Sequence, residues 1–152
     1  MTQNNFGIAY RDLAMIFNEE DNLKRAVDAY TEALKYYTPQ SAPLHYAGTQ
    51  YNLGIAYRAL AKLANRTDNL QRAVHVGIEA LKYYTPQNTP LDYALTQRNL
   101  GIVYEELGDF PAAIACWREA ETYYRLTSYI SEADLVLRWI AEAEEQLSKG
   151  LG

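Results

Sequence analysis

The chain has 152 residues, a net charge of −5, 49% hydrophobic residues and one cysteine. These values suit a folded soluble protein the size of one domain or of three helical repeats with a cap. The acidic balance argues against nucleic acid as a partner, and one cysteine cannot form an internal disulfide. Without an apolar run of roughly 18 residues or a signal-like start, we expect a cytoplasmic protein that does not enter membranes.

Apolar residues recur at helical spacing along the chain, and strand signals are lacking. In the first helix, Phe6, Tyr10, Leu13 and Phe17 would share one face. The pattern predicts an all-α protein with helices at about residues 2–18, 22–37, 43–65, 69–84, 90–107, 110–126 and 131–148.

Helix boundaries follow from capping residues and prolines. Asp21, Asp68 and Asp109 are placed to cap the helices that follow them, because a carboxylate can accept from the free amides of a first turn. Thr-Pro at 38–39 and at 85–86 is expected to stop the second and fourth helices, because proline disfavours helix at the residue before it.

One segment of the sequence is repeated at a spacing of 47 residues. Shifting Gln3–Gln50 by 47 positions matches 31 of 48 residues, and the phrases that begin at Asn5 and Asn52 recur at Asn99. A fixed period of this size predicts stacked like units. Thr2 and Gln3 align with Thr49 and Gln50 inside a helix pattern, so we expect that the chain belongs to a longer array.

The third copy carries the spacing of a known signature in Leu100, Gly101, Tyr104, Gly108, Asp109, Phe110, Ala113, Trp117 and Ala120. This pattern resembles the tetratricopeptide repeat family. The 47-residue form, with Tyr-Tyr-Thr-Pro before Pro-Leu-x-Tyr-Ala, is similar to bacterial repeats found in multidomain proteins with caspase-like (CHAT) protease or nucleotide-binding domains.

The resemblance implies one domain over residues 1–152: a right-handed superhelical α-solenoid of helix pairs at about 2–37, 43–84 and 90–126. A capping helix at about 131–148 would close its end. It also implies a scaffold that binds a protein or peptide on the concave face of the first helices. Gly77 replaces the aromatic residue of the other copies, which predicts a dent that neighbouring side chains close or a partner fills.

Asn5, Asn52 and Asn99 are the candidate ligand-binding residues, because a side-chain amide can both accept from and donate to a peptide unit. A structural alternative is that each asparagine ties neighbouring helices together. Arginines on the same face could hold an acidic or C-terminal peptide through paired hydrogen bonds, against the alternative of a solvated charged face. The remaining candidate residues are Arg11, Arg58, Arg98, Tyr51 and Ile55.

No phosphate loop, metal-ligand cluster or catalytic constellation is apparent in the sequence. We therefore expect a protein that is not an enzyme and needs no cofactor or metal. The competing hypothesis is a structural solenoid that associates with itself through its terminal repeats, most simply as a closed homodimer.

Overall fold

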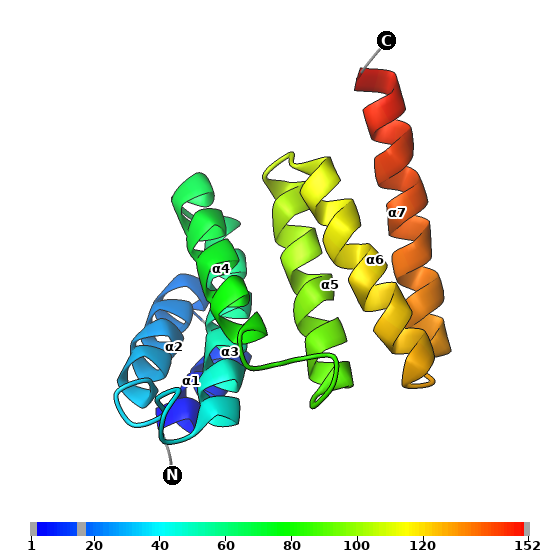
Figure 1. The fold of residues 1–152 in the computed structure, drawn as a ribbon. Helices are drawn as coiled ribbons and strands as arrows, with labels where there is room; N and C mark the ends of the chain where they lie inside the picture. The colour runs from blue at the N-terminus through cyan, green and yellow to red at the C-terminus, as the bar shows by residue number, and fades with distance from the viewer. Residues whose placement is uncertain (1–2, 15–17, 151–152) are drawn as a thin grey trace. The chain divides into compact units, whose positions relative to one another are not determined.

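The computed structural model describes residues 3–14 and 18–150. The regular secondary structure in these ranges is entirely α-helical, which confirms the all-α prediction (Figure 1). Most helix ends lie within about one turn of their expected positions; Phe17 falls outside the described residues. The helices are α1 (Gln3–Ala14), α2 (Glu19–Ala33), α3 (Pro43–Ala61), α4 (Arg66–Leu81), α5 (Pro90–Glu106), α6 (Phe110–Leu126) and α7 (Ile130–Gly150).

Two of the three predicted aspartate caps are wrong. Asn18 and Asn65 occupy the N-cap positions of α2 and α4, in the left-handed region with φ near 45°, which asparagine tolerates better than most residues. Asp21 and Asp68 therefore lie inside the first turn, where their negative charge still stabilises the helix by interacting with the positive end of its dipole. Asp109 does cap α6, since its carboxylate accepts from the amide of Ala112 at 3.1 Å.

The second helix of each of the first two pairs ends before the Thr-Pro sequence that was expected to stop it. α2 ends at Ala33, and the amides of Tyr36 and Tyr37 both donate to the Ala33 carbonyl. The chain thus leaves the helix through a tight turn. Thr38 and Ser41 then hold the following loop by hydrogen bonds between their side chains and backbone.

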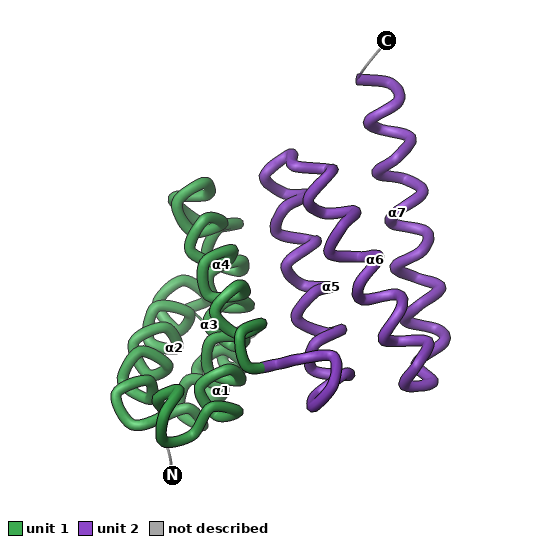
Figure 2. Tube along the Cα trace, viewed as in Figure 1, with its two compact units in different colours: residues 1–83 green, residues 84–152 purple. Residues whose placement is uncertain are grey.

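The described helices form two compact units, residues 1–83 and 84–152 (Figure 2). In the first unit, α1 packs on α2 and α3 packs on α4, while α2 also packs on α3. In the second unit, α5 packs on α6 and α6 on α7. The expectation of one domain over the whole chain stays a prediction.

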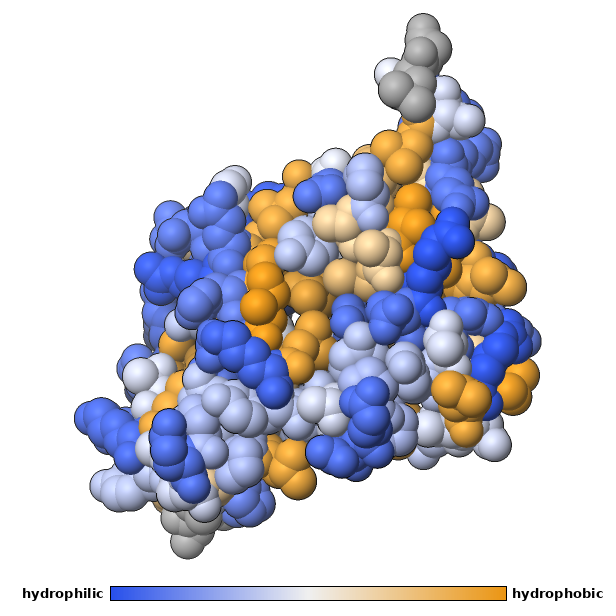
Figure 3. Space-filling model, in the orientation of Figure 1, coloured by the Kyte–Doolittle hydropathy of each residue, from blue (hydrophilic) through white to orange (hydrophobic). Residues whose placement is uncertain are grey.

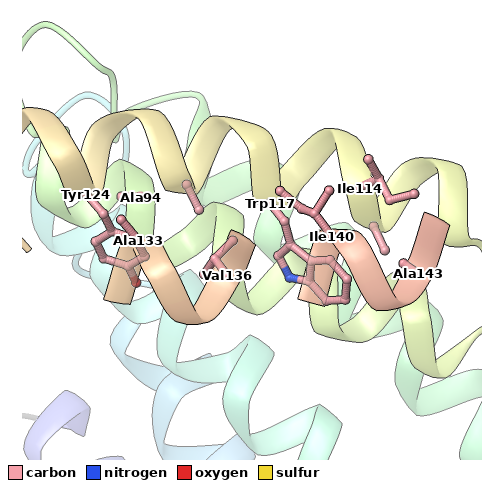
Figure 4. Close-up of a cluster of buried hydrophobic side chains, with 10 residues drawn as sticks. Ala94, Ile114, Trp117, Tyr124, Ala133, Val136, Ile140 and Ala143 are labelled. Atoms are coloured by element: carbon pink, nitrogen blue, oxygen red, sulfur yellow. The ribbon is translucent and has the colours of Figure 1, made fainter. Parts of the chain in front are cut away.

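Each unit has its own apolar core. In the first, Leu53 of α3 packs with Ala26 and Tyr30 of α2 and Val76 of α4, and Leu60 packs with Leu23. In the second, Figure 4 shows the buried side chains of α6 and α7 facing one another. The fully buried residues there include Trp117, Tyr124, Ala133 and Val136.

Helix α7 packs one side on α6, and its exposed residues are mostly polar but include Ile130 and Leu137. Its buried residues, Ala133, Val136, Ile140 and Ala143, follow helical spacing. In Figure 3 the upper part of the outer edge of α7 is hydrophilic, and hydrophobic residues lie on the side toward α6 and also lower on the outer edge. The packing of α7 on α6 is thus established, and its role as the cap of a solenoid stays a prediction.

At the expected dent, Gly77 is preceded in the sequence by the larger Val76, and whether the dent is closed or filled by a partner stays a prediction. Gly77 is buried, and a methyl group added at Gly54 would lie 3.5 Å from Cγ2 of Val76, an ordinary contact. The other two copies place an aromatic residue there after a smaller one, Ala29 before Tyr30 and Cys116 before Trp117. In the second copy, the larger residue of the pair comes first, and its side chain lies near Gly54.

Candidate functional site

The predicted binding residues lie on the first helix of each pair. In the first unit, Asn5 on α1 is exposed, and Asn52 and Arg58 on α3 are half-buried. Tyr51 and Ile55 are also half-buried on α3. In the second unit, Arg98 and Asn99 are half-buried neighbours on α5. Each unit therefore carries its own part of the candidate surface, and the ladder of three asparagines stays a prediction.

Two side-chain contacts connect α1 with α3 in the first unit. Nη1 of Arg11 donates to Oδ1 of Asn52 at 3.5 Å, a long hydrogen bond. The hydroxyl of Thr49, which is fully buried, has two acceptors within reach of its one proton, the carbonyl of His45 at 2.8 Å and Oδ1 of Asn4 at 3.2 Å. Asn52 thus contacts the preceding helix pair, as the structural alternative expects, through the oxygen of its amide.

Arg11 is held in place by a second partner. Its guanidinium also pairs with the carboxylate of Asp12 at 3.2 Å, with 28% of the arginine side chain and 65% of the aspartate exposed. Because the arginine has five N–H donors, these contacts leave donors that a bound carboxylate or peptide carbonyl could use.

The second unit places the same two residue types together. Nε and Nη2 of Arg98 both donate to Oδ1 of Asn99 at 3.4 Å. The backbone of Arg98 is fixed as well, because Nε1 of the buried Trp117 donates to its carbonyl at 3.2 Å. In both units a guanidinium lies on the carbonyl oxygen of a candidate asparagine, and the amide nitrogen takes no part in that contact.

A buried tyrosine lies close to the charged groups of α1. Tyr30 of α2 has no exposed surface, and among the described residues its hydroxyl has no hydrogen-bond partner. Burial raises the pKa of Tyr30 to about 12, an effect that the charge of Arg11 opposes and that of Asp12 reinforces. The phenol is therefore neutral at ordinary pH, beneath the candidate surface.

A hydrogen-bonded group that was not predicted from the sequence recurs in both units. It consists of a tyrosine hydroxyl, a glutamate and a glutamine, and is called the relay below. The hydroxyl of Tyr46 donates to Glu79 at 3.0 Å and is also hydrogen-bonded by Gln50. In the second unit, the hydroxyl of Tyr93 donates to Glu119 at 2.7 Å and accepts from Gln97 at 3.0 Å. The 47-residue spacing of the tyrosines and glutamines was a signal for this relay, but the glutamates are only 40 residues apart.

The aromatic rings of the relay are packed in the same way in each unit. Tyr46 meets Tyr83 edge to face with ring centroids 5.4 Å apart, and Tyr93 meets Tyr123 likewise at 5.2 Å. Such edge-to-face pairs are favourable beyond the area that they bury. Each relay therefore connects the first turn of one helix, α3 or α5, with the C-terminal part of the following helix, α4 or α6.

The cysteine and the potential metal ligands also lie among the described residues. Burial raises the pKa of the Cys116 thiol to about 12, with the charges of Glu119 and Asp109 adding to the effect, so the thiolate is disfavoured. Over residues 3–14 and 18–150, no three side chains of histidine, cysteine, aspartate or glutamate are grouped to hold a metal ion. Within the same ranges, every helix is too short or too polar to cross a bilayer.

Comparison with known proteins gives no further guide to the site. No protein-family model matches the chain, and no curated protein matches it.

Proposed function

We propose that this chain is a tetratricopeptide-like scaffold module that performs no catalysis and binds a protein or peptide segment through the first helices of its pairs, α1 and α3 in the first unit and α5 in the second. The observation that carries the proposal is the pairing of a guanidinium with an asparagine on these helices in each unit, Arg11 with Asn52 and Arg98 with Asn99. The pairing fixes the asparagine oxygen and turns the amide into an oriented donor for a peptide carbonyl.

The favoured ligand is an acidic or C-terminal peptide segment. In the first unit, α1 and α3 carry Arg11 and Arg58 together with the half-buried Tyr51 and Ile55, and in the second unit α5 carries Arg98. Guanidinium groups bind carboxylates through two parallel hydrogen bonds, and the apolar residues offer contact area for side chains. An extended α-solenoid, the arrangement that the resemblance implies, would present these residues along one groove.

A peptide-array screen with the full chain tests this proposal. Asn52→Ala should weaken binding of a selected peptide by about 1–2 kcal/mol, the scale of one hydrogen-bonding partner. Its thermal midpoint should change little, because Asn52 is only half-buried and its bond to Arg11 is long. Asn88→Ala, in an exposed loop, is the matched control and should leave both values unchanged.

Two outcomes would count against the proposal. If Asn52→Ala unfolds the chain while its folded fraction binds normally, the asparagine is a tie between helices. If no peptide binds to the wild-type chain, the face is not a peptide site.

Self-association is the second candidate, and one comparison within the chain favours it. Phe6 and Leu13 on α1 are 39% and 48% exposed, whereas Leu53 and Leu60, their counterparts 47 residues later, are 3% and 6% exposed. The later pair is covered by α2. Light scattering should then show a fraction of dimer that increases with protein concentration and that Leu13→Asp abolishes. A wild-type chain that stays monomeric at high micromolar concentration would exclude this function.

A further inference from the structure

A hollow of about 230 Å³ lies inside the first unit, lined by residues of α2, of the C-terminal half of α3 and of α4. Its floor is apolar and is formed by Val27 of α2 with Tyr57 and Leu60 of α3. Leu60 is 6% exposed and packs with the other two side chains. The hollow therefore belongs to the junction between the first two helix pairs, and the structure describes the helices on both sides of it.

One wall of the hollow is held in place by a buried asparagine. Nδ2 of Asn69, which is 8% exposed, donates to the carbonyl of Ala64 at 2.9 Å. Between them, Asn65 takes a left-handed backbone conformation with φ of 46° as the chain turns from α3 into α4. All three residues line the hollow. Its shape is thus set before anything binds, which lowers the entropic cost of binding.

Charged side chains form the rim of the hollow. Nζ of Lys24 pairs with Oε1 of Glu20 at 2.7 Å, and Nε of Arg72 pairs with Oδ2 of Asp68 at 3.2 Å. Asp28 lines the hollow as well, and within residues 3–14 and 18–150 its exposed carboxylate takes part in no ion pair. The rim therefore keeps one negative charge that no cation of this unit balances.

The structure also shows a cation bound at this rim. The guanidinium of Arg72 lies over the ring of Tyr57, with its central carbon 5.8 Å from the ring centroid, while Asp68 pairs with its Nε. An aromatic face attracts a cation through its quadrupole, and the carboxylate adds an opposite charge. Asp28 offers a second carboxylate from α2, beside the apolar floor and without a cation of its own.

We propose that this hollow binds a basic side chain, lysine or arginine, of a partner polypeptide. The aliphatic stem of that side chain would lie on Val27 and Leu60, and its charged end would pair with Asp28. Long basic side chains bury their stems on apolar surface in this way while the charge stays near water. The inference goes beyond the proposed function, because none of the residues that line the hollow belongs to the predicted ligand-binding residues.

Amide chemical shifts of the full chain, titrated with tripeptides that have blocked ends, test the proposal. The central residue of the tripeptide is lysine, arginine, glutamate or leucine, between two glycines. The lysine and arginine peptides should shift the amides of Val27, Asp28, Leu60 and Ala64. The glutamate and leucine peptides should bind roughly two- to fivefold more weakly, the scale of one exposed ion pair.

Two variants of the rim should change the affinity in opposite directions. Asp28→Asn keeps the size of an exposed side chain and should weaken the arginine peptide by roughly two- to fivefold. Arg72→Ala should strengthen its binding, because Asp68 and the ring of Tyr57 lose the cation that they now hold. Asp92→Asn, at an exposed aspartate of the second unit, is the matched control and should leave the affinity unchanged.

Four results would overturn the proposal. The first is equal affinity for the arginine and leucine peptides, which would show a general apolar surface. The second is an affinity that Asp28→Asn leaves unchanged, and the third is weaker binding in Arg72→Ala. The fourth is a set of shifts confined to residues such as Asn52 and Arg58, which would assign the basic peptide to the helices of the proposed function and leave the hollow empty.

Discussion

The indole of Trp117 lies directly against Gly101, so closely that a methyl group added to the glycine would come within 2.5 Å of the ring atom Cδ1. The ring cannot move away, because Trp117 is fully buried and its N–H is bound to the carbonyl of Arg98. Glycine inside a helix lowers stability by roughly 1 kcal/mol relative to alanine. At this position the close contact between α5 and α6 requires it.

Alanine scanning of the repeated glycines should therefore give opposite results at two equivalent positions. Gly101→Ala should lower the free energy of unfolding by about 1–3 kcal/mol through overpacking. Gly54→Ala meets only Val76 at 3.5 Å, so it should raise stability by roughly 0.5–1 kcal/mol through helix propensity. Urea denaturation monitored by circular dichroism measures both; equal effects would show that the aromatic contact does not control the cost.

Two tyrosine-to-phenylalanine substitutions should change the free energy of unfolding in opposite directions. Tyr30→Phe removes a buried hydroxyl that has no hydrogen-bond partner among the described residues, and should raise stability by up to about 1 kcal/mol. Tyr93→Phe removes a hydroxyl bonded to both Glu119 and Gln97, and should lower stability by about 1 kcal/mol. A loss of stability in Tyr30→Phe would mean that its hydroxyl has a partner.

Stability should fall at alkaline pH partly because of Cys116. Burial raises the pKa of its thiol from 9.0 to about 12, so the unfolded chain loses this proton at a lower pH than the folded chain. The stability that the protonated thiol contributes is fully present below pH 9 and is lost as pH rises toward 12. Over this range the free energy of unfolding should fall by up to about 1.4 kcal/mol per pH unit.

Denaturation at pH 8 and pH 10.5 checks this sign. Cys116→Ala should show a smaller difference between the two pH values than the wild type, even though the substitution itself costs packing. Identical differences in the two proteins would contradict a raised thiol pKa in the folded state.

Binding of an acidic peptide should depend on salt through Arg58. If its guanidinium contacts the ligand, Arg58→Ala should lower affinity at low salt and flatten the dependence of affinity on ionic strength. Isothermal titration at about 0.02 and 0.5 M salt measures both slopes. Arg138→Ala, which replaces an exposed side chain of α7, is the control. If Arg58→Ala leaves the salt dependence of the affinity unchanged, Arg58 does not belong to the site.

The candidate site could be predicted from the sequence only in part. The repeat identified Asn5, Asn52 and Asn99 as equivalent positions, and helical spacing placed them on the first helix of each pair. The arginines that form hydrogen bonds with these asparagines could not be predicted in this way. Arg11 contacts Asn52 of the next pair, whereas Arg98 contacts Asn99 beside it, so equivalent asparagines use arginines at different positions.

Local patterning in the sequence determined the helices, because apolar periodicity and prolines act within a few residues of one another. It did not determine the helix starts at Asn18 and Asn65, where a left-handed residue turned the chain three positions before the expected aspartate. Only the tertiary structure decided that Gly54 faces Val76 where Gly101 faces the ring of Trp117, and that the relay residues meet across two helices. The physical reason is that volume and hydrogen-bond partners are matched between side chains far apart in the chain, and the apolar period that predicts a helix does not record these matches.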